Sequence, residues 1–115
     1  MEEKLSAIMI KMAETVLKDT NAVSIEASHI ALLLASIAWN REVWGNDFQS
    51  TKQYWEIIKE LEEYNTLFWE DLKSRDCEVL IDELRYFKRK HYPQDNRIIK
   101  SCGSNERRKV QVIWE

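Results

Sequence analysis

Residues 84–93, LRYFKRKHYP, combine more reactive side-chain types than any other stretch of the chain. Arg85 and His91 have five residues between them, and these include a run of three cations at 88–90. A histidine can transfer protons near neutral pH and an arginine can stabilise a phosphate, so this pair could act on a phosphodiester. The run at 88–90 is also typical of a helix end, because the helix dipole favours positive charge there and Pro93 stops the helix. We favour a helix end or a phosphate-binding surface over a catalytic pair.

The spacing of Arg85 and His91 resembles the loose Arg-x(4 to 6)-His signature of HEPN-type ribonucleases, a family of helical and typically dimeric proteins. The resemblance implies that His91 would transfer the proton and that Arg85 would stabilise the phosphate. On a helix, however, six positions place the two side chains about 120° apart. His91 continues the apolar stripe, whereas Arg85 shares a solvated face with Glu78, Asp82 and Arg89. We therefore interpret His91 as a structural histidine and expect those four charged residues to pair with one another.

Two pairs of acids, Glu60 with Glu63 and Glu78 with Asp82, resemble the ExxE…ExxD arrangement of MazG-type nucleotide pyrophosphohydrolases. The resemblance implies a Mg²⁺ ion held between helices, since carboxylates suit a hard cation. The second pair departs from the pattern, because three residues rather than two separate its members. Both pairs also lie opposite the apolar stripes of their helices. We therefore interpret them as solvated acidic faces.

The histidines and cysteines give no ligand template. His29 belongs to an apolar segment and is expected to pack in the core. Together with Cys77, His91 and Cys102 it matches no spacing that is typical of a zinc site. The sequence therefore predicts neither a metal nor a cofactor.

The C-terminal part of the chain is rich in cations that lie among aromatic residues, a composition that suits phosphates and stacked bases. The candidates for nucleic-acid contact are Lys88, Arg89, Lys90, Arg97, Lys100, Arg107, Arg108 and Lys109. The net charge of −3 hides a division between the two parts of the chain. Residues 1–83 carry 8 Lys/Arg against 17 Asp/Glu, and residues 84–115 carry 9 against 3. Such asymmetry indicates nucleic acid, an acidic partner, or attraction between opposite ends of molecules in an oligomer.

Four amphipathic or apolar stretches must position these groups. Apolar residues at spacings of three and four predict helices over 3–18, 25–42 and 51–73, and a fourth that Asp76 caps and Pro93 ends. The second is apolar on nearly every side and should be central, and the third should be the longest. Residues 44–50, WGNDFQS, form the main turn. The apolar stripe of the fourth helix comprises Cys77, Leu80, Leu84, Phe87 and His91.

The C-terminal segment changes from helical to alternating periodicity. Residues 97–102 and 107–114 are rich in β-branched side chains, and residues 103–106, GSNE, predict a turn between them. We expect 107–115 to form a strand that pairs with 97–102 or with a neighbouring chain. Val110, Val112 and Trp114 share one face, which the bundle or a second subunit must cover. An edge strand can add another strand, so this arm is the first candidate for a subunit contact.

Aromatic residues gather around the second turn, and some of them are candidates for an interface. These interface candidates are Trp39, Trp44, Phe48 and Trp55, in addition to Val110, Val112 and Trp114 of the arm. A chain of 115 residues can hardly bury all five of its tryptophans, so burial in one chain and burial at a subunit contact are both open.

Composition limits the fold class. With two glycines, one proline and 44% hydrophobic residues, the chain is poor in turn formers. We predict one mainly α domain: a four-helix bundle over 1–93, followed by a basic C-terminal arm or β-hairpin over 94–115. The chain shows no leader pattern at its start and no apolar run of membrane-spanning length, so the expected location is the cytoplasm. The predicted function is that of a small non-catalytic interaction or regulatory protein that forms homo-oligomers. The alternative is a nucleic-acid-binding protein or a HEPN-like ribonuclease.

Overall fold

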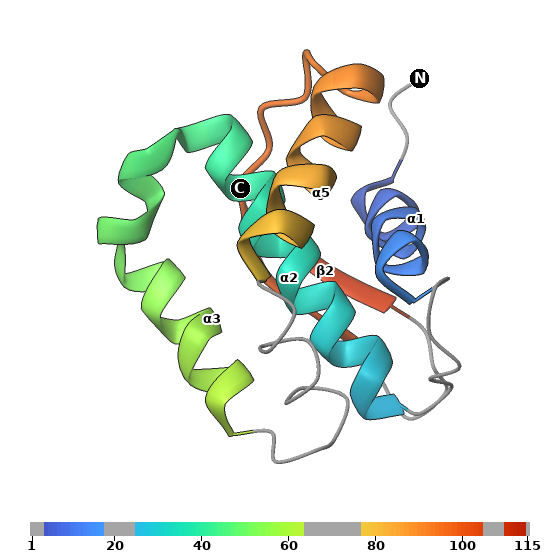
Figure 1. Ribbon diagram of the computed structural model, residues 1–115, viewed down its shortest axis with the longest axis vertical. Helices are drawn as coiled ribbons and strands as arrows, with labels where there is room; N and C mark the ends of the chain where they lie inside the picture. The colour runs from blue at the N-terminus through green and yellow to red at the C-terminus, as the bar shows by residue number, and fades with distance from the viewer. Residues whose placement is uncertain (1–3, 18–24, 64–76, 105–109, 115) are drawn as a thin grey trace.

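A computed structural model describes residues 4–17, 25–63, 77–104 and 110–114. The described chain is mainly helical and ends in a β-hairpin, which confirms the predicted fold class (Figure 1). In chain order the elements are α1 (Leu5–Leu17), α2 (Ile25–Trp44), the 3₁₀ helix η1 (Asn46–Ser50), α3 (Lys52–Glu62), α5 (Cys77–His91), β1 (Ile99–Ser104) and β2 (Val110–Trp114).

Helix α2 is the central element, as its nearly continuous apolar character predicts. Its residues from Ile30 to Arg41 are all buried. Helices α1 and α5 and strand β1 pack against it, and Figure 1 shows α1 and α3 on opposite sides of it. Within the described ranges, no helix combines the length and the apolar character that crossing a bilayer requires.

Helix α1 covers one side of α2 through a single apolar stripe. The side chains of Leu5, Ile8, Met9, Met12 and Val16 are buried, at the spacings of three and four that the sequence shows. The predicted first helix is therefore confirmed between Leu5 and Leu17.

The turn between α2 and α3 forms around Gly45, whose φ of 91° lies in the left-handed region that favours glycine. The chain then makes η1, and Thr51 caps α3. The Thr51 hydroxyl accepts a hydrogen bond from the Tyr54 N–H at 3.2 Å and donates one to the Phe48 carbonyl at 2.7 Å. The predicted turn is thus a break between helices that contains a short helix of its own.

Helix α3 is shorter than the predicted third helix. It ends at Glu62, with 11 residues, and α2 with 20 residues is the longest described helix. Ile57 and Leu61 are the buried residues of α3, and the predicted continuation over 64–73 lies outside the described residues. Figure 1 shows α3 at the edge of the molecule.

Helix α5 matches the predicted fourth helix. It ends at His91, two residues before Pro93, because a proline disfavours helical geometry in the residue that precedes it. The expected cap Asp76 lies outside the described residues.

The C-terminal strands β1 and β2 pair antiparallel, with Cys102 opposite Val112 and Ser104 opposite Val110. The predicted turn at 103–106 was wrong at its start, because Gly103 and Ser104 belong to the paired strand. β1 packs on α2, β2 packs on α1, and Val112 is partly buried against the core. Both strands therefore pack on helices of the same chain.

Candidate functional site

One turn of α2, residues 39–42, WNRE, makes polar contacts both with helix α5 and with the C-terminal segment. Each of the four residues contacts a different distant residue or pair of residues. Trp39 binds Arg97, Asn40 binds Ile99, Arg41 binds Glu78, and Glu42 binds Arg85 and Arg89. We call these four residues the α2 hub.

Asn40 holds the start of β1. Its Nδ2 donates to the Ile99 carbonyl at 2.8 Å, and its Oδ1 accepts from the Ile99 N–H at 2.8 Å. Both residues are fully buried. The side-chain amide therefore satisfies a donor and an acceptor on the strand backbone, as a neighbouring strand would do.

Lys88 is a structural residue and not an exposed cation. Only 3% of it is exposed, and its ammonium donates to the carbonyls of Tyr92 at 3.1 Å and Asp95 at 2.9 Å. The same ammonium lies 4.5 Å from the centroid of the Trp39 ring. Burial lowers the pKa of Lys88, and the negative charges of Asp95 and Glu42 oppose that shift. The ammonium of Lys88 is therefore directed to backbone carbonyls just beyond α5, and its contact with nucleic acid stays a prediction.

Glu42 pairs with two arginines of α5. Its carboxylate accepts from Arg85 Nε at 2.9 Å and from Arg89 Nε at 2.8 Å. The hydrogen bond from Arg89 lowers the pKa of Glu42, and Arg85 adds to this effect against the cost of burial. Arg85 and Arg89 were expected to pair with acids on their own helix. They pair with α2 instead, because α5 turns this face toward the end of α2.

Arg41 is the residue of the α2 hub that binds Glu78, at the start of α5. It is 3% exposed, its Nη1 lies 2.7 Å from Glu78, and its guanidinium lies 5.8 Å from the centre of the Tyr54 ring. Burial lowers the pKa of Arg41, but the hydrogen bond to Glu78 and its charge outweigh burial, so the pKa is raised. The Nε of Arg41 is buried and has no hydrogen-bond partner among the residues that the structure describes. Arg41 and Glu78 therefore link α2 to the first turn of α5.

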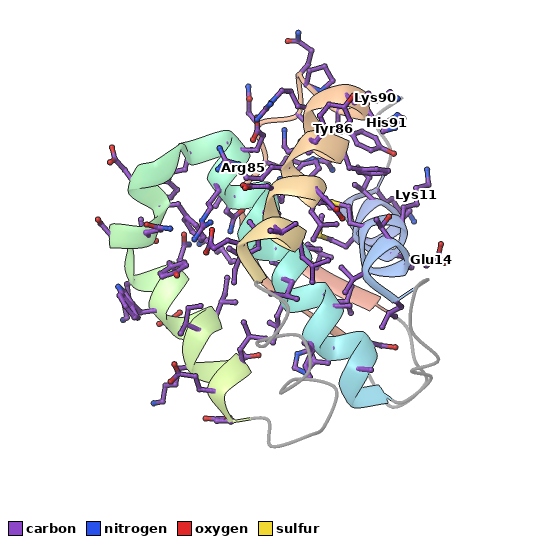
Figure 2. The ribbon with its side chains drawn as sticks, in the orientation of Figure 1. Lys11, Glu14, Arg85, Tyr86, Lys90 and His91 are labelled. Carbon is purple, nitrogen blue, oxygen red and sulfur yellow. The ribbon has the colours of Figure 1, made fainter. Side chains whose placement is uncertain are left out.

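The structure does not bring Arg85 and His91 together as a catalytic pair. Figure 2 shows Arg85 on the side of α5 that faces α2, and His91 at the helix end, toward α1. The placement of His91 in the core stripe was wrong, because its side chain is exposed. Its ring centroid lies 4.7 Å from that of Phe87. His91 continues the spacing of the apolar stripe, but it lies at the end of α5, where the helix is no longer buried.

The acids that resemble a Mg²⁺ site are also separate. Glu60 lies 3.6 Å from His29, and Glu78 binds Arg41. His29 is corrected from a core residue to a partly exposed one, with 26% of its side chain accessible. Within the described residues, no group of three or more His, Cys, Asp or Glu side chains could hold a metal ion.

The remaining basic candidates differ in their surroundings. Arg97 binds Asp95, with Nε 2.9 Å from Oδ1, and this interaction outweighs burial and lowers the pKa of Asp95. Lys90 and Lys100 are exposed. The candidates Arg107, Arg108 and Lys109 lie outside the described residues.

The interface candidates divide into buried and exposed aromatic residues. Trp39 and Phe48 are fully buried within this chain and belong to its core, whereas Trp44 is 48% and Trp55 61% exposed. A series of ring contacts links the exposed pair through the core, with centroid distances of 6.1 Å for Trp44–Phe48, 5.8 Å for Phe48–Tyr54 and 5.3 Å for Tyr54–Trp55. We call these four residues the aromatic series. The side chains of Val110 and Trp114 are outside the description, and Val112 packs within its own chain.

Sequence reasoning missed Asn40, Arg41 and Glu42 as site residues. The available signal was the sequence NRE directly after ten nearly continuous apolar residues, within a helix that the pattern places in the centre. Polar residues in such a position must find partners, because burial without them is costly. The sequence could not name those partners.

Comparisons with known proteins give no match, so the site is interpreted from its own geometry. No family model matches the chain, and neither the curated proteins nor the solved structures include a match.

We expect Glu42→Gln to lower the free energy of unfolding by about 1 kcal/mol at pH 7, because neutral Gln makes weaker hydrogen bonds to the two arginines. The folded-state pKa of Glu42 lies below its ordinary value of 4.5. Its contribution is therefore complete above that pH and is lost as the pH falls through the folded-state value. Denaturant unfolding should show a smaller difference in the free energy of unfolding between Glu42→Gln and the parent protein at pH 3 than at pH 7. An equal difference at both values would contradict the role of the Glu42 charge, and Glu83→Gln on the exposed face of α5 is the control.

Proposed function

We propose that this chain is a small, non-catalytic interaction or regulatory protein of the cytoplasm that associates with a second copy of itself. The observation that supports the proposal is the aromatic series, because it exposes two tryptophans on a fixed frame. Large aromatic side chains with restricted motion are the usual anchors of protein interfaces.

Packing holds the aromatic series in place. Phe48 at its centre is fully buried, and Tyr54 is partly buried against the core. Thr51 lies between Phe48 and Tyr54 in the sequence, and its side chain caps the start of α3. An anchor that is already ordered loses little conformational entropy when it binds. The exposed tryptophans therefore have the physical properties of a preformed contact surface.

The charge distribution supports a second copy as the partner. Residues 1–83 carry a net −9 and residues 84–115 a net +6, and the charge that contacts within the chain leave unneutralised attracts the opposite part of a second copy. A nucleic-acid-binding function receives less support, since Lys88, Arg89 and Arg97 are occupied by contacts within the chain. The ribonuclease alternative receives little, because Arg85 and His91 face different helices (Figure 2).

We expect the purified protein to show a mass above that of one chain, 13.8 kDa, and to dissociate on dilution. Substitution of both exposed tryptophans, Trp44→Ser and Trp55→Ser, should shift the equilibrium to the monomer, because it removes the apolar anchors. Light scattering coupled to size exclusion, over a concentration series, measures the change.

The matched control is Tyr86→Ser on α5. Tyr86 is 60% exposed, close to the 61% of Trp55, but it lies outside the aromatic series. Its loss should leave the mass unchanged. A parent protein that stays monomeric up to high micromolar concentration would overturn the proposal of self-association. Equal effects of Tyr86→Ser and the tryptophan substitutions would remove the assignment to the aromatic series.

A further inference from the structure

The outward face of α3 carries a regular stripe of charge. Ile57 and Leu61 point into the core, and the opposite face presents four exposed residues at spacings of four, three and four. These are Lys52, Glu56, Lys59 and Glu63, which we call the α3 stripe. The last of them is the C-cap of the helix and keeps helical angles, with φ −72° and ψ −18°. All four side chains therefore lie on one line along the helix.

The signs along the α3 stripe alternate as plus, minus, plus, minus. When a second α3 approaches in the antiparallel direction, Lys52 faces Glu63 of the other copy and Glu56 faces its Lys59. Each opposite-charge pair then occurs twice, as a two-fold axis requires. In a parallel arrangement in register, every residue faces its own like charge, which is unfavourable. The stripe is therefore complementary to itself in the antiparallel orientation, which is also the one that a two-fold axis generates.

The stripe is accessible to such a partner. The side chain of Lys52 is 90% exposed and that of Glu56 is 63% exposed, and their charged atoms are 3.9 Å apart within the helix. A pair of this kind contributes little within one chain, so it can be shared with a second chain at low cost. Trp55 lies beside the stripe and adds an apolar surface of the kind that forms the centre of an interface.

We propose that two copies of the chain associate through α3 helices packed antiparallel, with the α3 stripes paired by opposite charge and Trp55 beside them. This inference rests on the proposed self-association and adds its contact helix, its symmetry and its orientation. Figure 1 agrees with it, since α3 lies at the edge of the molecule, where a second copy can approach it.

Two complementary variants test the pairing. One changes Glu56→Lys and Glu63→Lys, which makes the α3 stripe wholly positive, and the other changes Lys52→Glu and Lys59→Glu, which makes it wholly negative. Each variant alone should be monomeric, and an equimolar mixture should form a heterodimer. Sedimentation velocity measures the mass of each sample, and circular dichroism checks that each variant keeps its helices.

A matched pair of variants on one turn tests the orientation. Lys59→Glu alone places like charges opposite Glu56 twice, and it should weaken association by about tenfold or more. Adding Glu56→Lys restores opposite charges across the antiparallel contact and leaves the net charge of the chain as it was. The double variant should therefore recover most of the lost affinity.

The outcomes separate this inference from the proposed function. If the parent protein forms a dimer that Trp44→Ser with Trp55→Ser dissociates but the charge variants leave intact, the α3 pairing is wrong and self-association stands. If the oppositely charged variants do not form a heterodimer although both are folded, the pairing is overturned in the same way. A monomeric parent protein overturns both proposals.

Discussion

Asn40→Ala is expected to lower the free energy of unfolding by about 3 kcal/mol, since it leaves a buried donor and a buried acceptor without partners. Both groups belong to the backbone of Ile99, which is fully buried at the start of β1. Asn40 and Ile99 are both fully buried, so bulk solvent does not reach these two backbone groups in the parent protein. Urea unfolding, with the parent protein under the same conditions, measures the loss.

Asn40→Leu distinguishes the hydrogen bonds from the volume of the side chain. Leucine fills a similar space but offers neither a donor nor an acceptor, so it should destabilise the protein nearly as much as alanine. The amide of Ile99 should also exchange with solvent faster in both variants, because β1 loses its attachment to α2. A leucine variant as stable as the parent protein would contradict the role of Asn40 as a backbone partner.

Local periodicity was sufficient to predict the helical architecture. The stripe of α1 and the continuous apolar character of α2 each follow from contacts that repeat along one helix, which the sequence displays directly. The hairpin was also predicted, but the first two residues of its predicted turn belong to β1. A glycine followed by serine and asparagine is typical of a turn, but Gly103 lies in β1 opposite Gln111. A glycine indicates that the backbone can be flexible at that position, but it does not indicate which residue pairs with it.

The α2 hub could not be derived from the sequence, because its contacts join residues that lie 37 to 59 positions apart. Neither the position of Asn40 in the sequence nor its residue type indicates that its partner is Ile99. A neighbour on α2 would fit the sequence equally well. The burial of Lys88 could not be predicted for the same reason. A run of three cations at a helix end is normally solvated, and only the position of Trp39 on α2 shows that Lys88 is covered.

The hub also explains why the basic part of the chain is less available than its composition suggests. Arg85 and Arg89 bind Glu42, so one acid of α2 offsets two cations of α5. Charge that appears as an excess of one segment is thus partly neutralised by another when the chain folds. In contrast, the α3 stripe lies on the face opposite the core of its own helix. The folded protein therefore exposes the alternating charges on α3, whereas Lys88 of the basic run on α5 is buried and Arg89 is paired with Glu42.

Trp39→Leu is expected to lower the free energy of unfolding by about 3 kcal/mol, because a fully buried indole is replaced by a smaller side chain. The loss includes the hydrogen bond from Nε1 to the Arg97 carbonyl, which is 2.6 Å long. It also removes the ring beneath the Lys88 ammonium. Chemical denaturation measures the total effect.

A double-mutant cycle with Lys88→Met isolates the contact between the ring and the ammonium. Methionine retains most of the apolar stem of Lys88 and removes its charge, so the cycle with Trp39→Leu should give a coupling of about 1 kcal/mol. The cycle is informative because the Lys88 ammonium has two kinds of neighbour, a pair of backbone carbonyls and the Trp39 ring. If the two substitutions add without coupling, the carbonyls alone hold Lys88, and Trp39 contributes through its volume and its hydrogen bond to Arg97.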